Sequence, residues 1–133
     1  IPEPPMPTKW ICRALRNTRH LPAFAFVTPN TRNDGHDDGT RRGNQRVDAW
    51  AHANIGRLLR SRAYRSGRVA VFVWYDEDRP VPNLVIAPTA TAGPVTLPGA
   101  GAASTLRAWE QMLGLPLLGN AATAPNQRRV QNV

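Results

Sequence analysis

Lysine is almost absent from this chain of 133 residues, in which Lys9 is the single lysine and the other sixteen basic residues are arginines. Acidic residues are also few: there are nine, so the formal net charge is +8. Arginine binds phosphate through two parallel hydrogen bonds, a geometry that lysine lacks. The composition therefore favours an anionic partner, although a solvated basic surface would carry the same charge.

Cysteine and long apolar runs are lacking as well. Cys12 is the single cysteine, which excludes an internal disulfide. No stretch of 18 apolar residues occurs, and the first residues lack the basic-then-apolar order of a signal peptide. Because the sequence starts at Ile1 rather than methionine, we expect it to be a piece of a longer protein or to have lost an upstream segment. Its length and its hydrophobic content of 41% suit one domain with a core.

The few acidic residues are concentrated at two places. Six of the nine form two clusters, one around His36 and one after an apolar run: Asp34, Asp37 and Asp38, then Asp76, Glu77 and Asp78. Adjacent carboxylates repel one another unless a cation or a dense set of hydrogen bonds holds them. The pattern predicts a bound divalent metal ion. The alternatives are local turns closed by the aspartates themselves in the first cluster and a solvated loop in the second.

The apolar run before the second cluster, residues 69–75, has the length and β-branched content of a buried parallel strand. Residues 22–27 also read as a buried strand, and the apolar spacing from 47 to 59 predicts a helix between the two. Strand, helix and strand in this order indicate a βαβ crossover, which makes the strands parallel. Because the loops after parallel strands emerge at one edge of a sheet, both acidic clusters should lie there.

The remaining segments extend this interpretation. Residues 84–87 predict a further strand, and 104–113 a last helix that ends at Gly114. The fold class predicted is α/β, with a mostly parallel sheet flanked by helices. Residues 1–20 are expected to form an extended proline-rich arm, 21–125 the α/β domain, and 126–133 a polar tail.

Several short motifs follow one another in a distinctive order. They are LPAFAFVTPN at 21–30, NDGHD at 33–37, DAW at 48–50, VFVWYDED at 71–78, and LGLP at 113–116 with LG at 118–119. This order resembles the carboxyl-terminal half of bacterial phosphoesterases, namely the secreted acid phosphatases, phosphatidylinositol phosphatases and phospholipase-C-like enzymes of the alkaline phosphatase superfamily. The resemblance covers residues from about 21 to 125. It implies an incomplete alkaline-phosphatase-like fold and a protein that is secreted or held in the cell envelope.

The resemblance also assigns roles to individual residues. It implies that Asp34, His36 and Asp37 belong to the catalytic site, and that Asp34, His36, Asp76 and Glu77 ligate a divalent metal ion of unknown identity. Carboxylate oxygens and a neutral imidazole are suitable ligands for such an ion, which would polarise a phosphate ester. Arg41 and Arg42, close to the first cluster, could clamp the phosphate. They could equally neutralise Asp37 and Asp38.

The chain departs from the family in ways that affect catalysis. The Glu-Asn ligand pair and the serine or threonine nucleophile of the family's amino-terminal half have no counterpart here, and Ala102 stands where the family has a histidine. We therefore expect hydrolysis of phosphate esters only when another segment or partner chain supplies the missing half. The alternative is a non-catalytic basic module that binds polyanions or a partner subunit. A nucleic-acid binder fits the charge but has no recognised binding motif in this sequence.

Overall fold

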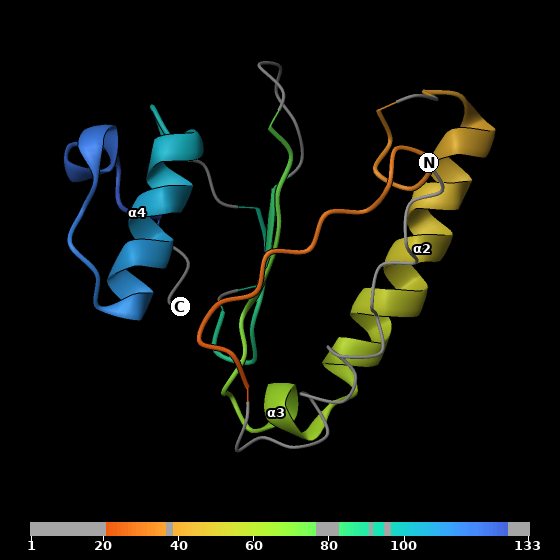
Figure 1. Cartoon of the computed structure of the whole chain (residues 1–133), viewed down its shortest axis with the longest axis horizontal. Coiled ribbons are helices and arrows are strands. Elements are labelled where there is room, and N and C mark those ends of the chain that lie inside the picture. Colours follow the sequence, from red (N-terminus) through yellow and green to blue (C-terminus); the bar gives the residue numbers. More distant parts are fainter. Residues whose placement is uncertain (1–20, 37–38, 77–82, 91, 95–96, 128–133) are drawn as a thin grey trace, which may run out of the picture. The chain divides into compact units, whose positions relative to one another are not determined.

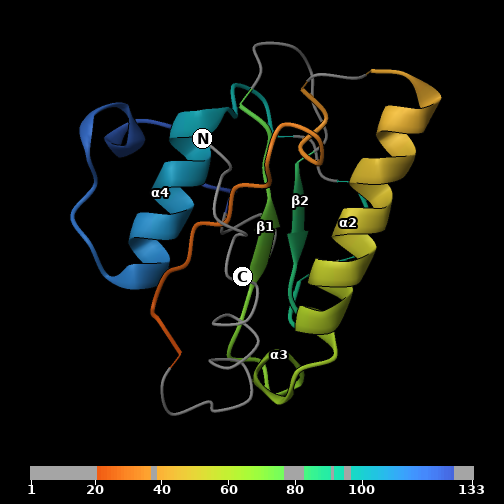
Figure 2. The ribbon, with the colours of Figure 1, turned by 45° about the vertical axis from the view of Figure 1, so that its right-hand side comes forward.

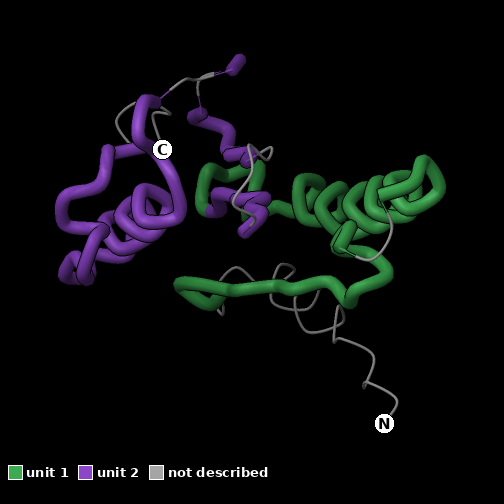
Figure 3. Tube along the Cα trace, turned by 90° about the horizontal axis from the view of Figure 1, so that it is seen from above, with its two compact units in different colours: residues 1–68 green, residues 69–133 purple. Residues whose placement is uncertain are grey.

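The computed structural model describes residues 21–36, 39–76, 83–90, 92–94 and 97–127 (Figure 1). The chain divides into two compact units, Ile1–Arg68 and Val69–Val133 (Figure 3). Each unit has its own helices, and the described strands belong to the second unit. Among the described residues no helix is both long and apolar enough to cross a membrane.

The first unit is built on helix α2, Arg41–Leu59, followed by the short helix α3, Arg62–Arg65. Each helix starts at a hydroxyl side chain that accepts a backbone N–H: Thr40 from Gly43 at 3.2 Å, and Ser61 from Tyr64 at 3.2 Å. The helix predicted for 47–59 is thus confirmed. It starts earlier than predicted, at Arg41, because the side chain of Thr40 caps the helix there.

The strand predicted for residues 22–27 is wrong. These residues have no regular secondary structure, and their large side chains are exposed, Phe24 by 46% and Phe26 by 62%. The two rings lie near each other, with centroids 6.4 Å apart. An apolar run becomes a strand only where a neighbouring strand takes up its backbone groups, and within the described residues none pairs with this segment.

The second unit contains the sheet, and the prediction of a mostly parallel sheet flanked by helices is wrong. Its described strands are β1, Val71–Val73, and β2, Leu84–Ile86, which run antiparallel with Phe72 opposite Val85 (Figure 2). The connection between them, residues 74–83, is shorter than the dozen or more residues that a parallel crossover needs. The chain therefore returns as a hairpin.

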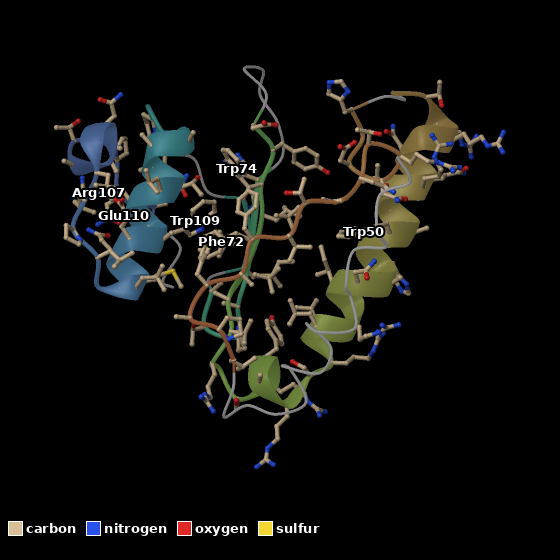
Figure 4. All side chains as sticks on the ribbon, viewed as in Figure 1. Trp50, Phe72, Trp74, Arg107, Trp109 and Glu110 are labelled. Carbon is tan, nitrogen blue, oxygen red and sulfur yellow. The ribbon has the colours of Figure 1, made fainter. Side chains whose placement is uncertain are left out.

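Helix α4, Ala102–Leu113, packs on this hairpin through one aromatic residue. The indole of Trp109 makes edge-to-face contacts with Phe72, at a centroid distance of 5.9 Å, and with Trp74, at 6.1 Å (Figure 4). Ala108, beside it in the helix, is fully buried. The helix predicted for 104–113 is confirmed.

The end of α4 is closed by Gly114, which has a left-handed backbone with φ of 67°. The N–H of Leu115 then donates to the carbonyl oxygen of Glu110 at 2.8 Å, the pattern of a Schellman cap. The short 3-10 helix η2, Gly119–Ala122, follows, with Ala121 and Ala124 buried. This confirms Gly114 as the predicted helix stop.

Replacing Gly114 with alanine should lower the free energy of unfolding by about 1 kcal/mol. An added Cβ would meet no atom within 4 Å, so the cost comes from the backbone conformation alone. Urea denaturation measures it. Gly39→Ala is the matched control, because Gly39 also has open space around its Cα but no left-handed backbone. An equal loss in both variants would contradict this account.

Candidate functional site

The loop that carries the first acidic cluster is folded by its own side chains and backbone. The carbonyl oxygen of Asn30 accepts hydrogen bonds from the N–H groups of Asn33, at 2.8 Å, and Asp34, at 3.1 Å. The side-chain amide of Asn33 donates to the side-chain oxygen of Asn30 at 2.6 Å. These hydrogen bonds hold the backbone at Asp34 in a turn.

Asp34 and His36, both predicted site residues, are brought together. Oδ1 of Asp34 accepts the backbone N–H of His36 at 2.9 Å, and Gly35 between them has a φ of 92° that a side chain would disfavour. A Cβ on Gly35 would lie 3.6 Å from Cγ2 of Val47, so this turn lies close to α2. The Asx turn expected as the structural alternative is therefore present. The carboxylate of Asp34 and the exposed imidazole of His36 carry atoms of the kinds that ligate metal ions.

Arg41 and Arg42 are the first two residues of α2 and are exposed. They therefore lie where the unpaired N–H groups of a helix start favour an anion. A neighbouring contact joins the loop to the helix, since Nε of Arg46 donates to the carbonyl oxygen of Arg32 at 3.4 Å. The loop and the first turns of α2 thus form one local structure within the first unit. Asp37, the third predicted catalytic residue, lies outside the described residues.

Asp76 belongs to the second unit and is exposed three residues after β1. The side chain of Asn83 accepts the N–H of Tyr75 at 3.0 Å, which joins the two arms of the hairpin just before Asp76. Glu77 lies outside the described residues. Both acidic clusters were expected at one edge of a parallel sheet. That edge is not formed, because residues 22–27 form no strand and β1 pairs with β2 antiparallel.

The described residues supply metal ligands of the right kind but in small number. Across these residues, no group of three or more His, Cys, Asp or Glu side chains is arranged to hold an ion. Asp34 and His36 offer one carboxylate oxygen and one imidazole, whereas zinc sites commonly use three or four protein ligands. Asp34 and His36 would therefore supply part of the ligand set of a metal site, and further ligands would have to come from other residues.

The first unit also carries a run of exposed arginines that none of the sequence motifs includes. No acidic residue occurs between Asp48 and Asp76, and five arginines lie in that stretch, all exposed: Arg57, Arg60, Arg62, Arg65 and Arg68. The sequence signal for this basic region is the lack of any Asp or Glu between residues 48 and 76, and no short motif marks it. These residues lie at the end of α2, in α3 and just after it.

Searches for relatives identify no family for these features. No protein-family model, no curated protein and no solved structure matches this chain.

Proposed function

We propose that this chain is the carboxyl-terminal part of a metal-dependent phosphoesterase, which hydrolyses phosphate esters when another segment supplies the remaining ligands and the nucleophile. The observation that carries the proposal is the turn in which Asp34 accepts the N–H of His36 at 2.9 Å. It supports the proposal because the turn orders the backbone between a carboxylate and a histidine, within one of the motifs on which the resemblance to phosphoesterases is based.

The roles proposed for these residues follow from their chemistry. Oδ2 of Asp34 and a ring nitrogen of His36 would hold a divalent ion, and the ion when bound would stabilise negative charge on the phosphoryl group. Arg41 and Arg42 begin the helix that follows, and a guanidinium can bind two phosphate oxygens at once. In this role the chain orients the phosphate and neutralises its charge. The attacking group comes from elsewhere.

Metal binding tests the proposal. Calorimetric titration with manganese, zinc and calcium should show weak binding, because the described loop provides two ligands. At an ion concentration equal to the dissociation constant, the stabilisation expected is about 0.4 kcal/mol, so the melting temperature should rise only slightly. Asp34→Asn and His36→Ala should each abolish the heat.

Asp48→Asn provides the control, since Asp48 is an exposed carboxylate of α2 outside the turn. Its titration should equal that of the original protein. Absence of heat with all three metals, or heat that survives Asp34→Asn, would refute the proposal. Asp76→Asn measures separately whether the second unit takes part.

A further inference from the structure

Three of the four arginines of α2, together with Arg60 at its C-cap, lie on one side of the helix. At 3.6 residues per turn, Arg42, Arg46, Arg57 and Arg60 project within about 60° of one another around the axis. We call these four residues the arginine stripe. Arg60 is the C-cap and keeps a helical backbone, so it continues the stripe. The stripe is about 27 Å long at 1.5 Å per residue.

Small residues occupy the rest of this side. Ala49 and Ala53 are exposed and project from the same side of α2 as the stripe. Together with the four arginines they fill an arc of about 80° around the helix axis, and no other residue of α2 projects within that arc. The carboxylate of Asp48 projects more than about 100° away from the middle of the stripe. Because alanine side chains are short, nothing on α2 protrudes between the arginines, and no acidic residue of α2 lies among them. Nitrogen-tipped side chains can be seen extending outward from α2 and from the region of α3 in Figure 4.

Three arginines that follow α2 in the chain extend the positive field beyond the helix. Arg62, Arg65 and Arg68 follow directly and are exposed, and the next carboxylate along the chain is Asp76. A group of charges of one sign raises the local concentration of a polyanion and speeds its association. Guanidinium groups add hydrogen bonds to phosphate oxygens in a fixed geometry.

The kind of polyanion follows from what the stripe carries and what it lacks. A straight row of cations over about 27 Å suits a stiff, regularly charged rod, and duplex nucleic acid has one phosphate charge for each 1.7 Å or so of its axis. Single strands are bound by exposed aromatic rings that stack on bases, and the stripe has none. Lipid surfaces are bound by helices with large apolar side chains next to the basic ones, whereas here alanines lie between the arginines.

We propose that the arginine stripe of α2 is a docking surface for the phosphate backbone of double-stranded nucleic acid, bound without regard to base sequence. This inference shares Arg42 with the proposed phosphoesterase site, but it requires neither a metal ion nor Asp34 and His36. Four phosphate contacts predict that the logarithm of the affinity falls with the logarithm of salt concentration with a slope of about −3.6.

The test is fluorescence anisotropy of labelled duplex DNA of about 20 base pairs, a length chosen to exceed the stripe, with the full chain in EDTA so that metal binding has no bearing. Arg42→Gln/Arg60→Gln should weaken binding at least tenfold at low salt and reduce the magnitude of the slope by about 2. Arg65→Gln/Arg68→Gln removes the same charge away from the stripe and should weaken binding less than threefold, because it lowers only the surrounding field. Arg42→Lys/Arg60→Lys should keep the salt slope, because it preserves the charge. This variant therefore shows whether the weaker duplex binding of the glutamine variant reflects lost charge or misfolding.

The result expected is duplex binding that depends on the stripe and is equal for unrelated sequences. Equal losses in the stripe and control variants would overturn the proposal, since they would show a response to net charge alone. Tighter binding to single-stranded DNA, or stripe-dependent binding to anionic phospholipid vesicles without duplex binding, would overturn it as well.

Discussion

Replacing Trp109 with alanine is expected to lower the free energy of unfolding of the second unit by about 3 kcal/mol. The indole touches both Phe72 and Trp74, at centroid distances of 5.9 and 6.1 Å, and each such aromatic pair adds roughly 0.5–1.5 kcal/mol beyond the area it buries. An isolated two-stranded hairpin is marginally stable in water. Removal of the ring that covers β1 should therefore weaken the sheet and α4 together.

Urea denaturation followed by far-ultraviolet circular dichroism measures this effect without relying on the fluorescence of the residue that is replaced. Trp109→Phe keeps an aromatic ring at the same place and should cost less than half as much. A loss below about 0.5 kcal/mol for Trp109→Ala, the size of a typical surface effect, would show that the contacts of Trp109 contribute little to stability.

Glu110 is expected to be the second residue on which this unit depends. Its side chain is 3% exposed, and its two carboxylate oxygens accept the N–H of Leu118 at 3.2 and 3.3 Å. Glu110→Ala should cost about 2 kcal/mol, because hydrogen bonds to charged groups contribute 1.5–3 kcal/mol and the donor is left without its acceptor. Glu110→Gln keeps one acceptor oxygen and should lose about half as much.

Hydrogen exchange distinguishes this effect from general loss of packing. In Glu110→Ala the amide of Leu118 should exchange more than tenfold faster, while amides in α2, which belongs to the other unit, should not change. Nearby, Nη1 of Arg107 donates to the carbonyl oxygens of Ala122 and Ala124 at 3.2 and 2.7 Å. If the Leu118 amide kept its rate in Glu110→Ala, the bond to Glu110 would not be what holds the segment after α4.

The helices could be predicted from sequence because their signals are local. Apolar spacing in 47–59 and 104–113 predicted α2 and α4, and Gly114 gave the end of α4. The short helix α3 was not predicted, since four residues are too few for a periodic pattern. Its cap at Ser61 becomes informative only when Tyr64 is seen to donate to it.

The sheet could not be predicted in the same way because strand pairing is not local. Residues 22–27 and 69–75 have similar apolar composition, yet the first forms no strand while Val71–Val73 pairs with Leu84–Ile86. Of the candidate site, the turn at Asp34 could be anticipated from the Asn-Asp-Gly sequence, and Oδ1 of Asp34 does accept the backbone N–H of His36. The assignment of Asp34 and His36 to a metal site stays a prediction. The assignment of Asp76 to the same edge depended on parallel strands, and its basis was lost with them.

The exposed segment with Phe24 and Phe26 has a consequence for the behaviour of the protein in concentrated solution. Residues 23–28 are uncharged, rich in aromatic and apolar side chains, and about as long as the segments that assemble into intermolecular β-sheets. Pro22 and Pro29 stand immediately on either side. Because a proline has no N–H to donate, an intermolecular strand formed by this segment could not continue past Pro22 or Pro29 along the chain. The two prolines act as gatekeepers that limit aggregation at a place where apolar rings are left in contact with water.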